Sequence, residues 1–313
     1  MVTDVGLGGM SVISEIQAAI DKDGFPFVKV KLMYFNCGVR PGYTKRPLAE
    51  QITLFQCALE AMDMFKPDIV LIACNTLSVL YAETPHSKSM KVPVLSIVDF
   101  GINLFSTEAK ANPGGAFLVF GTDTTAKVAA HQKGMGKLGY PIDRVVMWGC
   151  PKLATNIQLT GAESDEVRGC INGFIDAAWK EMEARNLSPP VTAVYAGLCC
   201  THYGYSAKLW TERLATLSAT SIGKQKTAII NPNVVMAAYI ANEAKRRGID
   251  MLSPTDATVT EFVVISRLPL TTEIESIAPL LCEKAEKALR NYIPRPQRDH
   301  PIVLRGLLGN VKE

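Results

Sequence analysis

Short apolar runs alternate with amphipathic helical patterns along most of the chain, and this alternation constrains the fold more than any other feature. Ile69–Ala73 and Ala116–Phe120 are continuous apolar runs, which is typical of parallel strands buried on both faces. Ser11–Ile20, Leu48–Phe65 and Glu166–Arg185 instead carry apolar residues at helical spacing. Strands and helices that alternate at this distance predict parallel βαβ units with helices on both faces of a sheet.

Size and composition fit a globular protein with a small-molecule partner. The chain has 313 residues, 48% of them hydrophobic and 20% charged, and at roughly 150 residues per domain it contains about two domains. Its net charge of +3 is too small to indicate a nucleic-acid-binding surface. The start lacks a secretory pattern, and the longest uncharged apolar stretch, Ile69–Ala82, is too short to span a bilayer. We therefore expect a cytoplasmic protein with neither a nucleic-acid nor a membrane partner.

Two parts of the chain share one plan. In each part a buried strand leads into a turn of small residues, Gly6–Gly9 and Gly121–Thr125, and a later buried strand ends in cysteine and threonine, Cys74–Thr76 and Cys200–Thr201. Ligands of open parallel sheets bind outside the carboxyl ends of the strands. The pattern therefore predicts two similar α/β lobes, each with its polar residues at these ends.

Eight cysteines are the unusual count in the composition. A leaderless chain of this size does not need a disulfide framework, so we interpret them as packing residues, metal ligands or reactive thiols. Cys74 and Cys200 each follow a buried strand, near an expected helix N-terminus that would lower the thiol pKa and favour the thiolate. We expect the others to be packing or incidental, with Cys37 and Cys199 near the proposed cleft. These others are Cys37, Cys57, Cys150, Cys170, Cys199 and Cys282.

Metal and nucleotide motifs are weak. Cys199, Cys200 and His202 could suggest zinc, but adjacent cysteines do not fit the usual ligand spacing and no second cluster is present. Gly134–Gly139 matches a dinucleotide pattern but follows a predicted helix, and Gly6–Gly9 lacks the lysine of a P-loop. We therefore expect no metal and no nucleotide.

Four segments resemble, in this order and with suitable gaps, the motifs of the glutamate racemases in the cofactor-independent aspartate/glutamate racemase superfamily. They are Asp4–Val12, Ala73–Thr76, Gly121–Thr125 and Cys200–Tyr203. The resemblance implies two lobes, each a mainly parallel sheet flanked by helices, with the active site in the inter-lobe cleft and no cofactor. It also implies that the chain returns to the first lobe after the second cysteine. The first lobe would comprise residues 1–97 and 226–313, and the second lobe residues 98–225.

The resemblance further implies an isomerase that inverts the Cα centre of an acidic amino acid and so supplies a D-amino acid as a peptidoglycan precursor. Inversion requires proton removal from one face and proton return to the other. Cys74 and Cys200 would be the two acid/base residues, assisted by Asp4 and His202. The residues that would contact the substrate are Val5, Pro41, Gly42, Tyr43, Asn75, Thr76, Thr122, Thr125 and Thr201.

Two departures from the family pattern leave the exact substrate open. Val5 stands where the family usually has serine, and Cys37–Tyr43 is one residue shorter than the family's loop for the distal carboxylate. Alternatives are an aspartate or hydantoin racemase, a maleate-type isomerase or decarboxylase with one nucleophilic cysteine, or a two-lobe binding protein without activity. Near the C-terminus we expect a charged amphipathic helix over Thr272–Asn291 and then a tail, Ile293–Glu313, that forms an oligomer contact, a strap over the body or a solvated end. The role of the extension 268–313 stays open, and a homodimer is compatible with the sequence.

Overall fold

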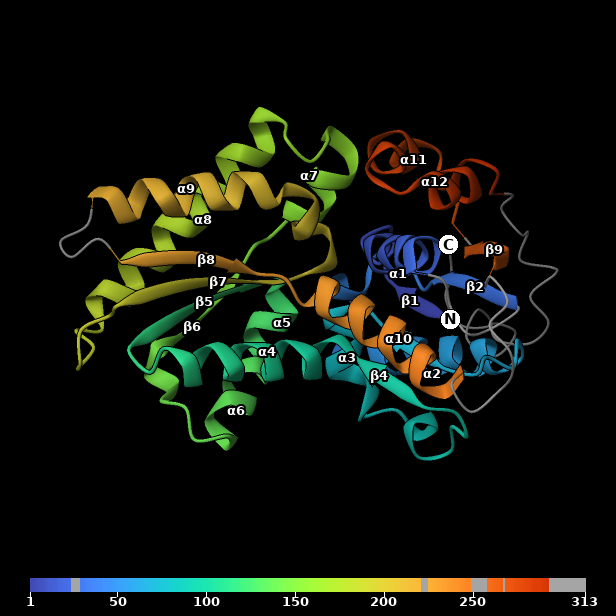
Figure 1. Ribbon diagram of the computed structural model, residues 1–313, viewed down its shortest axis with the longest axis horizontal. Coiled ribbons are helices and arrows are strands. Elements are labelled where there is room, and N and C mark those ends of the chain that lie inside the picture. Colours follow the sequence, from blue (N-terminus) through green and yellow to red (C-terminus); the bar gives the residue numbers. More distant parts are fainter. Residues whose placement is uncertain (24–28, 221–224, 249–257, 267, 293–313) are drawn as a thin grey trace.

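Two parallel sheets form the core of the protein (Figure 1). The computed structural model describes residues 1–23, 29–220, 225–248, 258–266 and 268–292. The first sheet has the strand order β4-β3-β1-β2-β9 and the second β6-β5-β7-β8, with every pairing parallel. The strands are β1 (Val2–Asp4), β2 (Lys29–Asn36), β3 (Val70–Ile72), β4 (Val94–Ser96), β5 (Gly115–Gly121), β6 (Val145–Gly149), β7 (Ala193–Cys199), β8 (Lys226–Ile230) and β9 (Thr258–Ser266).

Helices cover both faces of the sheets, so the predicted α/β class with two mainly parallel sheets is confirmed. Figure 1 shows α8 and α9 on one side of the second sheet and α4 and α6 on the other. Within the described ranges no helix has the length and apolar character needed to cross a membrane. The helices are α1 (Met10–Asp23), α2 (Leu48–Asp63), α3 (Asn75–Tyr81), α4 (Ile97–Ala111), α5 (Asp123–Val128), α6 (Ala130–Lys137), α7 (Leu153–Thr160), α8 (Asp165–Ala184), α9 (Ala207–Thr220), α10 (Pro232–Gly248), α11 (Thr271–Ile277) and α12 (Glu283–Arg290).

The hydrophobic core runs from one lobe into the other. One cluster of buried residues contains Val2 and Tyr34 from the first sheet together with Phe120 and Leu198 from the second. Strand β5 is buried along its whole length and alternates between two clusters, since Phe120 packs in this cluster and Phe117 in another on the opposite face. Burial on both faces explains why this strand is apolar at nearly every position.

Three features differ from the sequence prediction. Lys226–Ile230 pairs with β7, so the expected return to the first lobe at residue 226 comes too early; we propose that the first lobe resumes with α10, which packs on α1. A short helix, α7, lies in a segment where we expected none. The single helix expected over Thr272–Asn291 is interrupted at Ala278–Leu280, where Pro279 lacks the amide that would continue it. The expected tail from Ile293 lies outside the described residues.

A buried histidine in α6 makes the stability pH-dependent. His131 is fully buried, neither ring nitrogen has a hydrogen-bond partner, and burial lowers its pKa to about 4. The unfolded chain protonates this ring below about pH 6.5, whereas the folded chain does not until about pH 4. The folded state therefore loses stability as the pH falls through this window.

Replacing His131 by phenylalanine removes this loss, because the new ring has no proton to take up and still packs beside Phe105, whose ring centroid lies 5.7 Å from that of His131. We expect the free energy of unfolding of the variant, relative to wild type, to rise by about 2 kcal/mol between pH 7 and pH 5. Urea unfolding at both pH values measures it. An equal loss of stability in the two proteins would contradict the assignment.

Candidate active site

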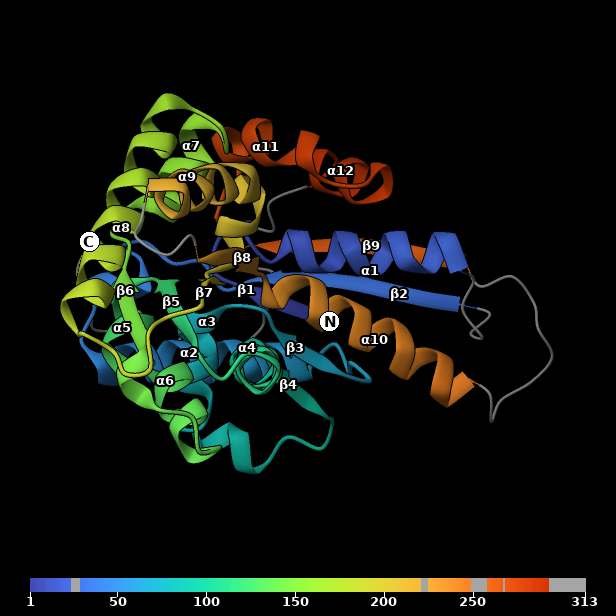
Figure 2. The ribbon, with the colours of Figure 1, turned by 60° about the vertical axis from the view of Figure 1, so that its left-hand side comes forward.

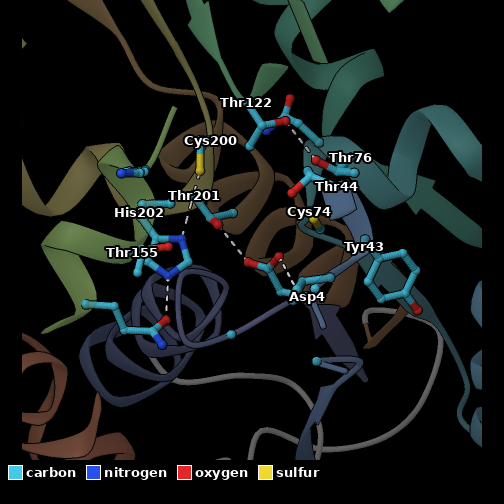
Figure 3. Close-up of a pocket in the computed structure, with 18 of the residues that line it drawn as sticks. Asp4, Tyr43, Thr44, Cys74, Thr76, Thr122, Thr155, Cys200, Thr201 and His202 are labelled. Atoms are coloured by element: carbon cyan, nitrogen blue, oxygen red, sulfur yellow. Dashed lines mark hydrogen bonds between the residues drawn. The ribbon is translucent and has the colours of Figure 1, made fainter. Parts of the chain in front are cut away.

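A cavity of about 360 Å³ lies at the carboxyl ends of strands from both sheets. Its walls include Asp4 at the end of β1, Cys74 after β3, Thr122 after β5 and Cys200 after β7. The predicted cleft between the lobes is therefore present, and both cysteines chosen from the sequence line it (Figure 3).

Cys74 lies at the N-terminus of α3 and hydrogen-bonds Asp4. Burial raises the pKa of the Cys74 thiol well above its usual value, and the negative charge of Asp4 raises it further. The lowered pKa expected from the helix N-terminus is wrong, because α3 has only seven residues and desolvation of the thiolate outweighs its dipole. The Cys74 side chain is consequently a protonated thiol in the resting protein.

Asp4 connects the two lobes. Its carboxylate is buried, with Oδ1 accepting a hydrogen bond from the Val5 amide at 2.6 Å and Oδ2 accepting one from the Thr201 hydroxyl at 2.6 Å. Burial raises the pKa of Asp4, although these hydrogen bonds oppose the shift. A carboxylate with a raised pKa beside a thiol is well suited to exchange a proton with it.

Cys200 has a different acid–base partner on the opposite side of the cavity. Its sulfur lies 3.9 Å from Nδ1 of His202, and burial raises the pKa of the thiol to about 12. His202 is itself buried, which lowers the pKa of its ring to about 4. The ring is therefore neutral at physiological pH, and the thiol beside it is protonated.

The hydrogen bonds of Gln158 fix the tautomer of His202. The backbone amide of Leu7 donates to Oε1 of Gln158 at 3.0 Å, and the same oxygen lies 2.8 Å from Nε2 of His202. Because that oxygen only accepts, Nε2 must carry the ring proton, and Nδ1 presents its lone pair to Cys200. His202 is thus oriented to accept the thiol proton of Cys200.

Replacing Gln158 by leucine removes the acceptor that holds this tautomer. We expect kcat/KM to fall by about 10²-fold, the lower end of what general acid–base catalysis contributes. Gln158→Glu keeps an acceptor at the same place and should restore most of the lost activity while raising the pKa of His202, which NMR titration of the ring measures. An active leucine variant with an unchanged histidine titration would contradict this role.

The glycine turn between β1 and α1 is one place where the two lobes make contact. A Cβ added to Gly8 would lie 2.1 Å from the hydroxyl oxygen of Thr201 and 2.5 Å from Nδ1 of His202. Gly6 has a φ of +86°, and a Cβ there would lie 2.7 Å from Oε1 of Gln158. The lack of side chains at Gly6 and Gly8 therefore lets Gln158, Thr201 and His202 of the second lobe approach this turn.

Small polar side chains occupy the wall between the thiols. The Asn75 side chain is buried at the cavity, and neither of its amide atoms has a hydrogen-bond partner. The hydroxyl oxygens of Thr76 and Thr122 lie 3.0 Å apart across the lobes, and Thr122 also contacts Thr125 at 3.0 Å. Val5, Gly42 and Tyr43 line the cavity as predicted, with Tyr43 on the side of Cys74 in Figure 3.

No family model matches the chain. Curated glutamate racemases do: one from Helicobacter acinonychis is 30% identical over 142 residues, 44% of this chain and 51% of the relative. One from Campylobacter jejuni is 26% identical over 205 residues, 64% of this chain and 72% of the relative. The chain thus spans about half the length of the first Helicobacter relatives it matches.

Solved structures extend the similarity over most of the chain. A glutamate racemase from Francisella tularensis superposes with a TM-score of 0.65 at 17% identity, covering 93% of each chain. An isoform from Bacillus anthracis gives 0.64 at 18% identity, covering 89% of this chain and 92% of its own. The chain resembles the glutamate racemases in sequence and shares their fold. The resemblance to glutamate racemases inferred from the four sequence segments is confirmed.

The residues expected at or near the cleft do not all line the cavity. Thr125 is fully buried and contacts the cavity only through Thr122, and Pro41 is not among the lining residues. Thr201 lines the cavity, but its hydroxyl donates to Asp4. Cys199 also lines it, whereas Cys37 does not and instead has its sulfur 2.9 Å from the hydroxyl of Thr3.

Much of the cavity wall consists of residues that were not predicted from the sequence. Helix α7 could have been found from Leu153 and Ile157, which share one helical face, and from Gly161 as a stop signal. Among the described residues no group of three or more histidine, cysteine and acidic side chains could hold a metal ion. The missed lining residues with polar or bulky side chains include Asn36, Arg40, Thr44, Asp123, Lys152, Thr155, Gln158, Leu159, Leu268, Leu270 and Glu273.

Proposed function

We propose that this chain is a cofactor-independent glutamate racemase in which Cys74 and Cys200 are the two acid/base groups. The observation that carries the proposal is that each thiol has its own proton acceptor within one cavity, Asp4 for Cys74 and Nδ1 of His202 for Cys200. Because the two pairs come from opposite lobes, an amino acid between them presents opposite faces of its Cα to the two sulfurs. The similarity to glutamate racemases supports the same reaction.

The order of the proton transfers follows from the raised pKa values of the two thiols. In one direction Asp4 takes the proton of Cys74, the resulting thiolate removes the Cα proton, and the thiol of Cys200 delivers its own proton to the opposite face. Asp4 then releases its proton and Cys200 regains one through His202. In the other direction His202 accepts the proton of Cys200 first. Each cycle inverts one carbon and returns both thiols to the protonated state.

Asn75 supports an amino acid as the ligand. Both atoms of its buried amide lack partners, and such groups usually have them. We assign to Asn75, Thr76 and Thr122 the α-carboxylate and amino group of the substrate, with Thr125 holding Thr122 in place. Amide and hydroxyl donors there would stabilise the charge that develops on the carboxylate after deprotonation. Val5, Gly42 and Tyr43 are assigned to the wall around the distal group, with Pro41 in the same loop but outside the lining.

The comparisons support a small amino acid in this cavity. The Francisella tularensis racemase was solved with D-glutamate, and a similar racemase from Thermus thermophilus with β-chloro-D-alanine. We extend this class of ligand to the present chain. Because the proposed mechanism needs two free thiols, we propose that the enzyme works in a reducing compartment, the cytoplasm. A homodimer stays a prediction.

Val5 favours a second candidate, another reaction of the same superfamily such as aspartate racemisation or a step with a nucleophilic cysteine. Its side chain packs against the apolar cluster beside the cavity, so it offers no polar contact to the substrate. A covalent adduct on Cys74 or Cys200, detected by mass spectrometry after incubation with substrate, would favour the nucleophilic reaction.

Incubation of the protein with each enantiomer of glutamate tests the proposal. We expect both enantiomers to approach an equal mixture without added cofactor, followed by circular dichroism and chiral chromatography. Aspartate serves as the comparison substrate. If glutamate is converted in neither direction, the proposed function is wrong, and conversion of aspartate alone would favour the second candidate.

A further inference from the structure

The C-terminal segment forms one wall of the candidate active site. Leu268, Leu270 and Glu273 line the same cavity as the two thiols. Strand β9, which precedes them, is at the edge of the first sheet, whereas α11 packs against α7 of the second lobe (Figure 2). Leu268 and Leu270 therefore lie beside the cavity, between a strand of the first lobe and a helix that packs on the second.

Hydrogen bonds hold Leu268 in position. The hydroxyl of Ser266 donates to the Leu268 carbonyl at 2.9 Å, and the Tyr292 hydroxyl donates to the same carbonyl at 3.1 Å. Ser266 in turn accepts a hydrogen bond from the Asn36 side chain at 3.0 Å, and Asn36 also accepts one from the Gly38 amide at 2.8 Å. Tyr292, which follows α12, and Asn36, which lines the cavity, thus hold the backbone at Ser266 and Leu268 in position.

The Leu268 side chain points toward the loop that follows β2. A Cβ added to Gly38 would lie 3.3 Å from Cδ1 of Leu268, so the leucine methyl group reaches the loop itself. This loop continues through Gly42 and Tyr43, which line the cavity beside Leu268. With the distal group of the substrate assigned to this loop, as proposed above, a longer side chain would extend toward Leu268.

We propose that Leu268 is a specificity-determining residue that limits the length of the substrate side chain. The inference rests on the proposed function for the identity of the substrate, but not for the position of the wall. Truncation to alanine should enlarge the cavity at this end only. Room for one methylene in an apolar pocket changes selectivity by about 10- to 200-fold.

The test compares aspartate, glutamate and 2-aminoadipate, whose side chains differ by one methylene each. We expect Leu268→Ala to raise kcat/KM for 2-aminoadipate relative to glutamate by at least about tenfold. Leu280→Ala is the matched control, because Leu280 belongs to the same C-terminal segment but is 46% exposed and does not line the cavity. Tyr292→Phe, which removes only the hydroxyl that contacts the carbonyls of Ser266 and Leu268, should shift the ratio in the same direction by less.

Two outcomes separate the inference from the function on which it rests. If wild type converts glutamate but the ratio is unchanged in folded Leu268→Ala and in Tyr292→Phe, the wall does not select the substrate and the inference is wrong. If wild type converts none of the three amino acids, the proposed function fails. In that case calorimetry measures the dissociation constants of 2-aminoadipate and glutamate in wild type and in the same variants. A change of about tenfold in their ratio in Leu268→Ala supports the inference, and an unchanged ratio contradicts it.

Discussion

Serine in place of Cys74 or Cys200 is expected to lower kcat/KM for glutamate by at least about 10²- to 10⁴-fold, the range that general acid–base catalysis contributes. A hydroxyl is a far weaker acid than a thiol, so Asp4 or His202 cannot convert it into a base. One sulfur removes the Cα proton and the other delivers its own proton to the opposite face, so loss of either stops inversion. Because enantiomers have equal free energy, kcat/KM must fall equally in both directions.

Cys57→Ser is the matched control, since Cys57 is half-buried on α2 and does not line the cavity. It should retain wild-type turnover, measured by circular dichroism from each enantiomer. The double variant Cys74→Ser/Cys200→Ser should lose little more than either single variant, because residues that act as a unit are not additive. Near-normal activity in either single variant would remove that cysteine from the mechanism.

Alanine in place of Gly8 is expected to reduce kcat/KM by about 10²-fold, which is the cost of a misplacement of about 1 Å in a catalytic group. The new methyl group would lie 2.1 Å from the hydroxyl oxygen of Thr201 and 2.5 Å from Nδ1 of His202. Neither side chain can withdraw without breaking the contact of Thr201 with Asp4 or of His202 with Cys200. One methyl group would thus separate the acid–base residues of the two lobes.

Gly173→Ala provides the control for this substitution. Gly173 lies in helix α8, and a Cβ there would meet nothing within 4 Å. Alanine in a helix interior stabilises by about 1 kcal/mol relative to glycine, so this variant should gain stability and keep its activity. Wild-type turnover in a folded Gly8→Ala protein would show that the lobes need not approach as closely as the structure has them.

The fold could be predicted from sequence because its strands are buried on both faces. Runs such as Ala116–Phe120 are short, apolar at nearly every position and followed by turn residues, which is typical of a strand in the interior of a parallel sheet. Helix α7 was not predicted because it has only eight residues, of which only Leu153 and Ile157 are buried, and two apolar residues do not establish a helical period. The break near Pro279 shows how one proline divides an otherwise continuous helical pattern.

The candidate site could be predicted only in part. Cys74 and Cys200 were recognisable because the carboxyl ends of parallel strands meet at one edge. Their pKa values were predicted in the wrong direction, because burial depends on residues brought from both lobes and not on the local helix. Gln158 and Leu268 were missed for the same reason, since Gln158 contacts Leu7 and Leu268 contacts the loop at Gly38, both more than a hundred positions away along the chain.

The position of deuterium tests the two-thiol mechanism most directly. One enantiomer of glutamate is incubated with the protein in D₂O, and both enantiomers are analysed by mass spectrometry at low conversion. Cys74 and Cys200 acting on opposite faces predict deuterium at Cα of the product enantiomer and almost none in the recovered starting enantiomer. Deuterium that enters both enantiomers at equal rates would contradict the mechanism, because it would mean that one base serves both faces.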